Sequence, residues 1–412
     1  MKIVVLIMFA IFNCSSCSAQ NPESKLKELG FENVDLTCIG DTMYLSVEDP
    51  VYRGTFRGAG VALKNLSLLC PSIHCYDVVV KEDNVDKYAI SAQIEDGHWR
   101  VEVDYNSSRV NEIIRSNMNT GKAVRNYNKS VGKVNVTFYP IISFSNKVTY
   151  KLFTYGVMLA PAIETSLWKG NRVVVQPILP LFDNYDVFDN YDWYGERLGD
   201  FSHFQLGSVT LQQDLADNAK WWGRVYAGFF HYNNLGLNAD FGYHLNDRID
   251  IGVKASATRW QDLNDGKLWV EDDVKYSAIL SLSYYEPKTS TELKVTGGRY
   301  LYGDYGARLD GICHFGEYSI GLYAIYAGDE YNGGFHFSIP VAGKAQKRMG
   351  FVSLRVPEFF DWEYSLVNNY EWSGKRCGQM VEPLPARNRS GNYWQARYVQ
   401  SYLLKYLNGE VE

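Results

Sequence analysis

The most regular feature of the sequence is an alternation of apolar and polar residues that begins near residue 133 and continues almost to the C-terminus. In residues 235–245 every second position is Leu, Ala, Phe or Tyr, and Gly, Asn, Asp or His stands between them. Residues 249–258, 274–284 and 318–326 repeat the pattern. A period of two indicates β-strands with one apolar face. Each run lasts ~10–12 residues, the length of a tilted membrane-spanning strand, whereas strands of soluble domains are usually nearer five or six.

The ends of these runs and the loops between them point the same way. Aromatic residues gather at the ends of the strands, among them Tyr243, Trp260, Tyr284, Tyr305, Tyr318 and Tyr326. Aromatic girdles of this kind mark the two membrane–water boundaries of outer-membrane barrels. Short turns at 246–247, 286–290 and 315–317 alternate with longer loops at 261–273 and 328–333. We therefore predict an antiparallel transmembrane β-barrel of about twelve strands between residues 133 and 404, with its short turns and the basic turn 344–348 in the periplasm. A soluble β-sandwich or propeller is the competing architecture, but no blade-length repeat is visible.

A different pattern precedes the strands. Residues 25–125 contain a hairpin around Gly40-Asp41, a helical stripe over 56–70 that ends at Pro71, a second hairpin around Asp96-Gly97 and a short helix over 108–118. This order predicts a small α/β module, a sheet with helices on one face. The module contains no glycine-rich phosphate loop and no motif of catalytic spacing, so we interpret it as a binding or docking module.

The N-terminus resembles an export signal. Met1-Lys2 is followed by ten apolar residues and then by small residues around Ala19. This is the composition of a secretory signal peptide cleaved after Ala19, and lipid attachment at Cys17 is the alternative. The predicted organisation is a signal peptide at 1–19, a periplasmic α/β module at 20–128 and an outer-membrane β-barrel at 129–412, in a Gram-negative bacterium.

Composition excludes several classes of protein. Aromatic residues make up 15% of the chain, which is too many for a disordered protein. No later stretch approaches the ~18 apolar residues of a membrane-spanning helix, and the net charge of −6 argues against nucleic acid as a partner. Outside the leader no Cys-x-x-Cys or Cys/His set has metal-binding spacing, so no metal and no cofactor is expected. A disulfide between Cys70 and Cys75 and two buried thiols are both open.

Candidate chemistry is sparse. The near-repeat at 182–194 holds four carboxylates among aromatic rings, and its Asp186, Asp189, Tyr191 and Trp193 are candidates for contact with a glycan. The alternatives are an exposed loop whose rings lie at the membrane boundary, or a calcium site that lacks the usual glycine and closing Glu. A Ser–His–acid enzyme would use His203 or His231. His244 and His314 fall on the polar face of their strands and predict a lumen lining. Arg308 and Asp310 fall on the same side and predict an ion pair, and no residue is assigned a catalytic role.

Several short motifs resemble one protein family. Residues 29–34 (LGFENV) and the acidic stretch Glu48-Asp49 followed by Tyr52-Arg53 are similar to the start of the α/β module of the YjbH-like family of exopolysaccharide and capsule outer-membrane proteins, although Asp49 stands where that family usually has Asn. Residues 161–167 and 176–181 look like its early barrel strands, and 329–340, with GGFHFSIP, looks like its late signature. The resemblance implies an outer-membrane barrel with a periplasmic α/β part and no established catalytic residues.

Together these observations favour a non-enzymatic outer-membrane barrel that takes part in exopolysaccharide or capsule secretion or assembly. Its expected partners are outer-membrane lipid, the polysaccharide and periplasmic assembly proteins of the same system. Two other classes stay open, an outer-membrane barrel enzyme acting on lipid or glycan and a soluble surface glycan-binding β-protein.

Overall fold

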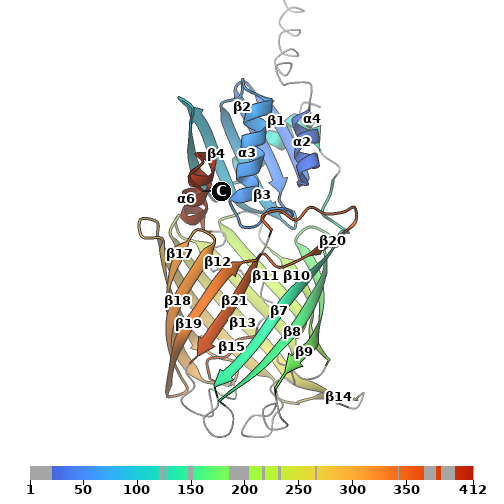
Figure 1. Ribbon diagram of the computed structural model, residues 1–412, viewed down its shortest axis with the longest axis vertical. Helices are drawn as coiled ribbons and strands as arrows, with labels where there is room; N and C mark the ends of the chain where they lie inside the picture. Colours follow the sequence, from blue (N-terminus) through green and yellow to red (C-terminus); the bar gives the residue numbers. More distant parts are fainter. Residues whose placement is uncertain are drawn as a thin grey trace, which may run out of the picture.

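The chain folds into a small α/β module that lies over one end of a large antiparallel sheet (Figure 1). The computed structural model describes residues 21–119, 124–125, 128–146, 152–184, 204–215, 219–230, 233–264, 267–341, 343–365, 377–381 and 395–411. The predicted signal peptide at 1–19 and the candidate glycan residues Asp186, Asp189, Tyr191 and Trp193 lie outside the described residues, as do His203 and His231.

The module is built on a six-stranded sheet in the order β5-β4-β3-β2-β1-β6. Its strands are β1 (Glu32–Ile39), β2 (Thr42–Glu48), β3 (Cys75–Glu82), β4 (Val85–Glu95), β5 (His98–Asp104) and β6 (Val124–Arg125). The two predicted hairpins are β1–β2 and β4–β5, and β2 pairs with β3 in parallel because α3 connects them. Cys75 is a free thiol, so the Cys70–Cys75 bridge is not formed.

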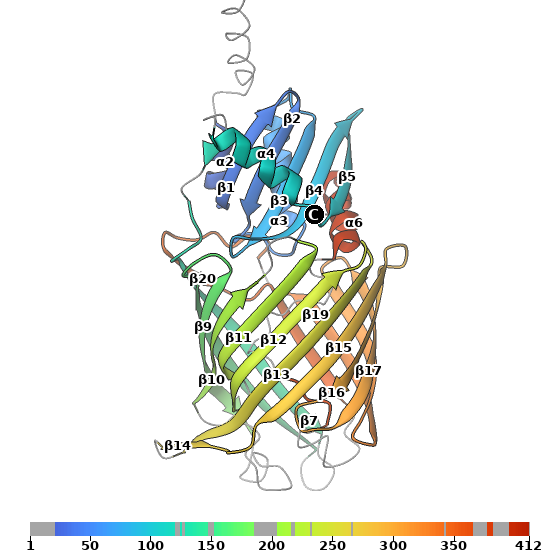
Figure 2. The same ribbon diagram turned by 180° about the vertical axis from the view of Figure 1, so that it is seen from behind.

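Helices cover both faces of the module sheet, not one face as predicted (Figure 2). The helices are α2 (Pro22–Leu29), α3 (Arg57–Leu69), α4 (Ser108–Asn119) and α6 (Ala396–Leu407). The first, second and last of these pack with Met43 and Leu45 on one face, and α4 packs on Tyr44 and Val79 on the other. Because neighbouring strand residues point to opposite faces, the apolar run at 43–45 supports two layers of helix.

The C-terminal helix corrects a second expectation. The strands are predicted to continue to residue 404, but residues 396–407 form α6, which returns to the module and joins its core. Tyr398, Val399, Tyr402, Leu403 and Leu407 are all buried there. They recur at the three- and four-residue spacing of a helix face, so burial of that face stabilises the helix against the module.

Gly60 on α3 makes the close approach of α6 possible. A Cβ at Gly60 would lie 2.3 Å from the Tyr406 ring. We predict that Gly60→Ala destabilises the docking of α6 by roughly 1–3 kcal/mol, although Ala is the better helix former. Faster hydrogen exchange in α6 would show it. Gly311→Ala, where the nearest atom is 3.9 Å away, is the control, and an α6 that exchanges at the wild-type rate in Gly60→Ala would contradict the prediction.

The large sheet has 15 strands in the described part of the chain, more than the predicted twelve or so. Its strands are β7 (Val134–Asn146), β8 (Phe153–Thr165), β9 (Asn171–Asp183), β10 (Gln205–Asp214), β11 (Trp221–Phe230), β12 (Asn234–His244), β13 (Ile249–Asn264), β14 (Lys267–Val270), β15 (Lys275–Glu286), β16 (Thr291–Arg299), β17 (Tyr305–Phe315), β18 (Tyr318–Ala327), β19 (Glu330–Pro340), β20 (Val352–Arg355) and β21 (Phe359–Ser365). Neighbours in sequence are mostly neighbours in space, and they pair antiparallel except for β20 on β7. The short β14 and β20 account for part of the excess.

The sheet curls until its first and last long strands, β7 and β21, face each other (Figure 1). Among the described residues no pairing joins these two strands. The short β20 instead pairs with β7 over Val134–Thr137, and β21 pairs with β19 on its other side. Both β7 and β21 run away from the module in Figure 1, so the sheet's edges meet in parallel orientation.

The alternation along the strands places polar side chains inside the curl and apolar ones outside. Mid-strand Leu237, Val253, Leu280 and Leu322 are exposed, whereas Asn238, Thr258, Ser277 and Glu292 are buried. Along β18 exposed and buried residues alternate without exception. This is the reverse of a soluble domain, whose apolar residues fill the core. In the described residues no helix is long and apolar enough to cross a membrane.

Candidate functional site

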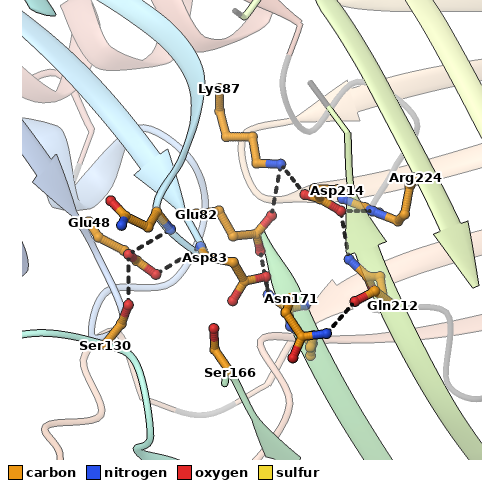
Figure 3. Close-up of polar contacts among 12 residues, drawn as sticks. Glu48, Glu82, Asp83, Lys87, Ser130, Ser166, Asn171, Gln212, Asp214 and Arg224 are labelled. Carbon is orange, nitrogen blue, oxygen red and sulfur yellow. Dashed lines mark hydrogen bonds and ion pairs between the residues drawn. The ribbon is translucent and has the colours of Figure 1, made fainter. Parts of the chain in front are cut away.

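A dense network of polar contacts lies where the module meets the sheet. Glu48, the last residue of β2, is the centre of its first part. Its carboxylate accepts hydrogen bonds from the backbone N–H groups of Asp83 (2.9 Å) and Asn84 (3.1 Å), from Asn33 Nδ2 (2.5 Å) and from Ser130 Oγ (3.1 Å). Figure 3 shows Glu48 between Ser130 and the β3–β4 turn. One buried side chain thus ties two hairpins of the module to the segment that enters β7.

The β3–β4 turn extends this network into the sheet (Figure 3). Arg172, at the start of β9, forms ion pairs with Asp83 and Glu82, and Lys87 Nζ lies 3.0 Å from Asp214 Oδ2 at the end of β10. The same Asp214 accepts from Arg224 Nε at 2.8 Å. The backbone N–H of Gly170 donates to the Asp83 carbonyl at 2.8 Å, so the turn is also fixed through main-chain bonds. Buried charges paired this closely resist separation, because parting them would leave uncompensated ions.

A second ion cluster joins the module to a predicted short turn. Glu317, between β17 and β18, lies 2.5 Å from Arg53 Nη2 and 3.2 Å from Arg57 Nη2. Arg53 also donates to the carbonyl of Val341 at 2.6 Å. The turn at 246–247 contacts α6 in the same way, through an Arg397–Asp247 pair at 2.5 Å. The short turns therefore lie on the module side of the sheet.

The basic turn at 344–348 completes this interface. Arg348 Nε lies 3.2 Å from Glu32 Oε1, and the Arg53 N–H donates to the Lys344 carbonyl at 3.1 Å. Lys133 Nζ reaches the same Glu32 oxygen at 2.7 Å. The module thus contacts the large sheet at several separate points, which favours a fixed orientation over the end of the sheet.

A cavity of about 150 Å³ lies inside this interface. Its walls come from the module, from the inward faces of β7, β8 and β9, and from the segment 346–358. Seven acidic and six basic side chains line it, namely Glu32, Glu48, Asp49, Glu82, Asp83, Glu164 and Glu358 with Arg53, Lys81, Lys133, Arg172, Arg348 and Arg355. Tyr52 and Tyr139 add ring surface. The cavity is therefore strongly polar yet close to neutral in total charge.

Burial changes the acid–base behaviour of two wall carboxyls. Burial raises the pKa of Glu48 to about 7, and the neighbouring Asp83 charge adds to the rise. Burial also raises the pKa of Asp49 to about 7, although backbone N–H groups of Tyr52 and Val51 donate to its carboxylate and oppose the shift. Around neutral pH both groups are therefore poised between the neutral and the charged form.

The histidines predicted to face the polar side are buried beside acids. His244 Nδ1 lies 2.6 Å from Asp250 Oδ1, and its ring stacks on Tyr105 of the module with ring centroids 3.7 Å apart. His314 Nε2 lies 3.3 Å from Glu292 Oε2. The expected Arg308–Asp310 pair forms at 2.7 Å. In the part of the chain that the structure describes, no cluster of His, Cys, Asp or Glu could hold a metal ion.

Sequence reasoning did not identify the interface cavity as a site. Its wall residues Glu48, Asp49, Tyr52 and Arg53 were noted only as a motif of family resemblance. Four polar or charged residues within six positions, beginning at the last residue of a buried strand, are a signal that could have marked them. The partners on β7 and β20 carried no such signal, because a polar residue at every second position is common to all strands of the sheet.

Residues 14–345 match the family model YjbH, described as exopolysaccharide biosynthesis protein YbjH. No curated protein and no solved structure matches the chain significantly. The match covers most of the chain and includes the module except α6, with its Glu48–Arg53 motif, and the large sheet through β19. The chain therefore belongs to the YjbH family of exopolysaccharide biosynthesis proteins.

Proposed function

We propose that the chain is a non-enzymatic outer-membrane β-barrel protein that takes part in the secretion or assembly of an exopolysaccharide or capsule. The observation that carries the proposal is the inverted polarity of the large sheet. Large apolar side chains cover its outside, and buried polar side chains line its inside. In water such an exposed apolar surface is unfavourable, at roughly 25 cal/mol per Å², whereas in a bilayer it is the preferred surface.

The arrangement of the ends supports a defined orientation in that membrane. The short turns and the module share one end of the sheet, and short turns of outer-membrane barrels face the periplasm. We place the module on the periplasmic side, where its exposed surface is available to periplasmic proteins of the polysaccharide system. The signal peptide expected at 1–19 fits this location.

Family membership supports the link to polysaccharide. The family description names exopolysaccharide biosynthesis, and the polar interior offers hydrogen-bonding groups to a hydroxyl-rich chain. In this proposal the protein acts by docking and guiding the polymer. Two alternatives remain to be tested. One is a barrel enzyme acting on lipid or glycan, and the other is a soluble glycan-binding protein.

The membrane placement is tested by one charge at the middle of an outward face. Leu322, on β18, is 70% exposed. We expect Leu322→Arg to cost roughly 2–4 kcal/mol in a bilayer, so less protein should reach the heat-modifiable form in outer-membrane fractions. Leu68→Arg on the module, at an 81% exposed position, should have no effect. Equal yields of both variants in a soluble fraction would support the soluble reading and contradict the membrane placement.

The polysaccharide role is tested in the bacterium that carries the gene. Deletion should reduce the polysaccharide at the cell surface, and the intact chain should restore it. Replacing His203, His231, His244 and His314 singly by Gln should leave that restoration intact if the role is non-enzymatic. Loss of surface polymer with any well-folded variant would instead favour the enzyme.

A further inference from the structure

We propose that the interface cavity binds a single neutral, hydroxyl-rich sugar unit. The proposal rests on the proposed polysaccharide role for the identity of the ligand, but not for the existence of the site. The cavity holds about 150 Å³, far more than the ~10–15 Å³ that one water requires. It therefore has room for a small ring-shaped ligand but not for a length of polymer.

Several buried polar atoms of residues that line the cavity have no hydrogen-bond partner among the described residues. They include Nη2 of Arg355, Oδ1 of Asn135 and Oε2 of Glu32, and Oγ1 of Thr55 is another. A buried polar group without a partner is unfavourable, and native proteins rarely leave one unless water or a ligand satisfies it. One donor and two acceptors that converge on one cavity are suited to hydroxyl groups, because a hydroxyl both donates and accepts.

The strand register explains why two of these groups share the cavity. In the parallel β7–β20 pair, Asn135 lies opposite Ser353 and Thr137 lies opposite Arg355. The alternate residues Val352 and Leu354 are exposed, so Asn135 and Arg355 point to the same inward side. Arg355 Nε donates to Ser353 Oγ at 2.9 Å, which fixes the guanidinium and leaves Nη2 directed elsewhere.

Glu32 is held in a comparable way on the module side. Glu32 Oε1 forms ion pairs with Lys133 Nζ at 2.7 Å and with Arg348 Nε at 3.2 Å. Its Oε2 has no hydrogen-bond partner among the described residues. The carboxylate is already compensated by these two cations, and Oε2 acts as a strong acceptor and not as an unpaired charge. Groups of the module and of the large sheet therefore hold these polar atoms in place before a ligand binds.

The charge balance of the wall selects the class of ligand. With seven acidic and six basic groups, two of the acids being partly neutral near pH 7, the cavity has no large excess of either sign. An anionic or cationic ligand would meet like charges close by, and a neutral ligand would not. The rings of Tyr52 and Tyr139 offer an apolar surface to the C–H face of a pyranose.

Binding is tested with the purified full chain in a sugar-free detergent, by saturation-transfer NMR and titration. The probes are methyl glucoside and methyl galactoside as neutral pyranosides, with glucuronate and glucosamine as charged ones. We expect a neutral pyranoside to bind best. Arg355→Met should weaken it roughly tenfold or more, since a bond to a charged group is lost, and Asn135→Leu by roughly twofold to tenfold.

Asn238→Leu is the matched control. Asn238 also points inward from its strand and also has an unpartnered Oδ1, but it does not line the cavity. Its replacement should leave the affinity unchanged. The proposal is overturned if no pyranoside binds, if a charged sugar binds better, or if both cavity variants bind as the wild type does. Heat-modifiable migration of each variant shows that it has folded, and a failure to bind sugar would leave the test of membrane placement untouched.

Discussion

Glu317→Gln should loosen the module from the large sheet by several kcal/mol. The Glu317 carboxylate compensates Arg53 at 2.5 Å and Arg57 at 3.2 Å, and all three side chains are largely buried. Removing one member of a buried ion cluster leaves the others uncompensated and typically costs about 3–5 kcal/mol. Because Arg53 also holds the carbonyls of Val341 and Gly343, the segment that leads from β19 toward β20 should loosen as well.

Hydrogen exchange of the purified protein in increasing urea measures this effect. We expect α3 and the β17–β18 turn to lose protection at a lower urea concentration in Glu317→Gln than in the wild type. The control is Glu286→Gln, which removes the charge from a partly exposed partner of Arg248 at 3.5 Å and should change the stability little. If the two variants behaved alike, the Glu317 cluster would not be what fixes the module.

The second large effect is a dependence of module stability on pH. The pKa values of Glu48 and Asp49 are raised by burial from 4.5 and 3.8 to about 7 in the folded protein. As the pH rises from about 4 to 7, the unfolded chain ionises first and so binds fewer protons than the folded one. The contribution of these two groups to stability is therefore highest in acid, falls through this window and stays low above it. The change is on the order of several kcal/mol.

The double variant Glu48→Gln, Asp49→Asn should lack this loss. Both amides keep a carbonyl oxygen to accept from the backbone N–H groups of Asp83 and Val51, the bonds that the carboxylates make now. Relative to the wild type, the variant should gain stability progressively between pH 4 and 7 and hold the gain at higher pH. Glu95→Gln, at the end of β4, should show no such trend. A difference between variant and wild type that does not change with pH would contradict the assignment of these groups.

Much of the fold was predictable because local patterns report local structure. The period of two over residues 235–326 predicted strands of the large sheet. The turn signals at Asp96-Gly97 and Gly40-Asp41 predicted two hairpins of the module. The helix predicted over 56–70 is α3. The C-terminal helix was missed because the short apolar run at 402–406 is compatible with either period, and only its packing against Gly60 and the module core selects the helix.

The sequence by itself determined where the strands lie and that each has one apolar and one polar face. The period of two alone could not determine which face points outward, because it is the same for a sheet that buries its apolar face and one that exposes it, and only the strand lengths and the aromatic strand ends predicted a polar interior. The curl of the sheet decided that the polar face is inside. The tertiary structure alone also brought Glu32, Asn135 and Arg355 to one cavity, since groups far apart along the chain meet only when the module docks on the sheet.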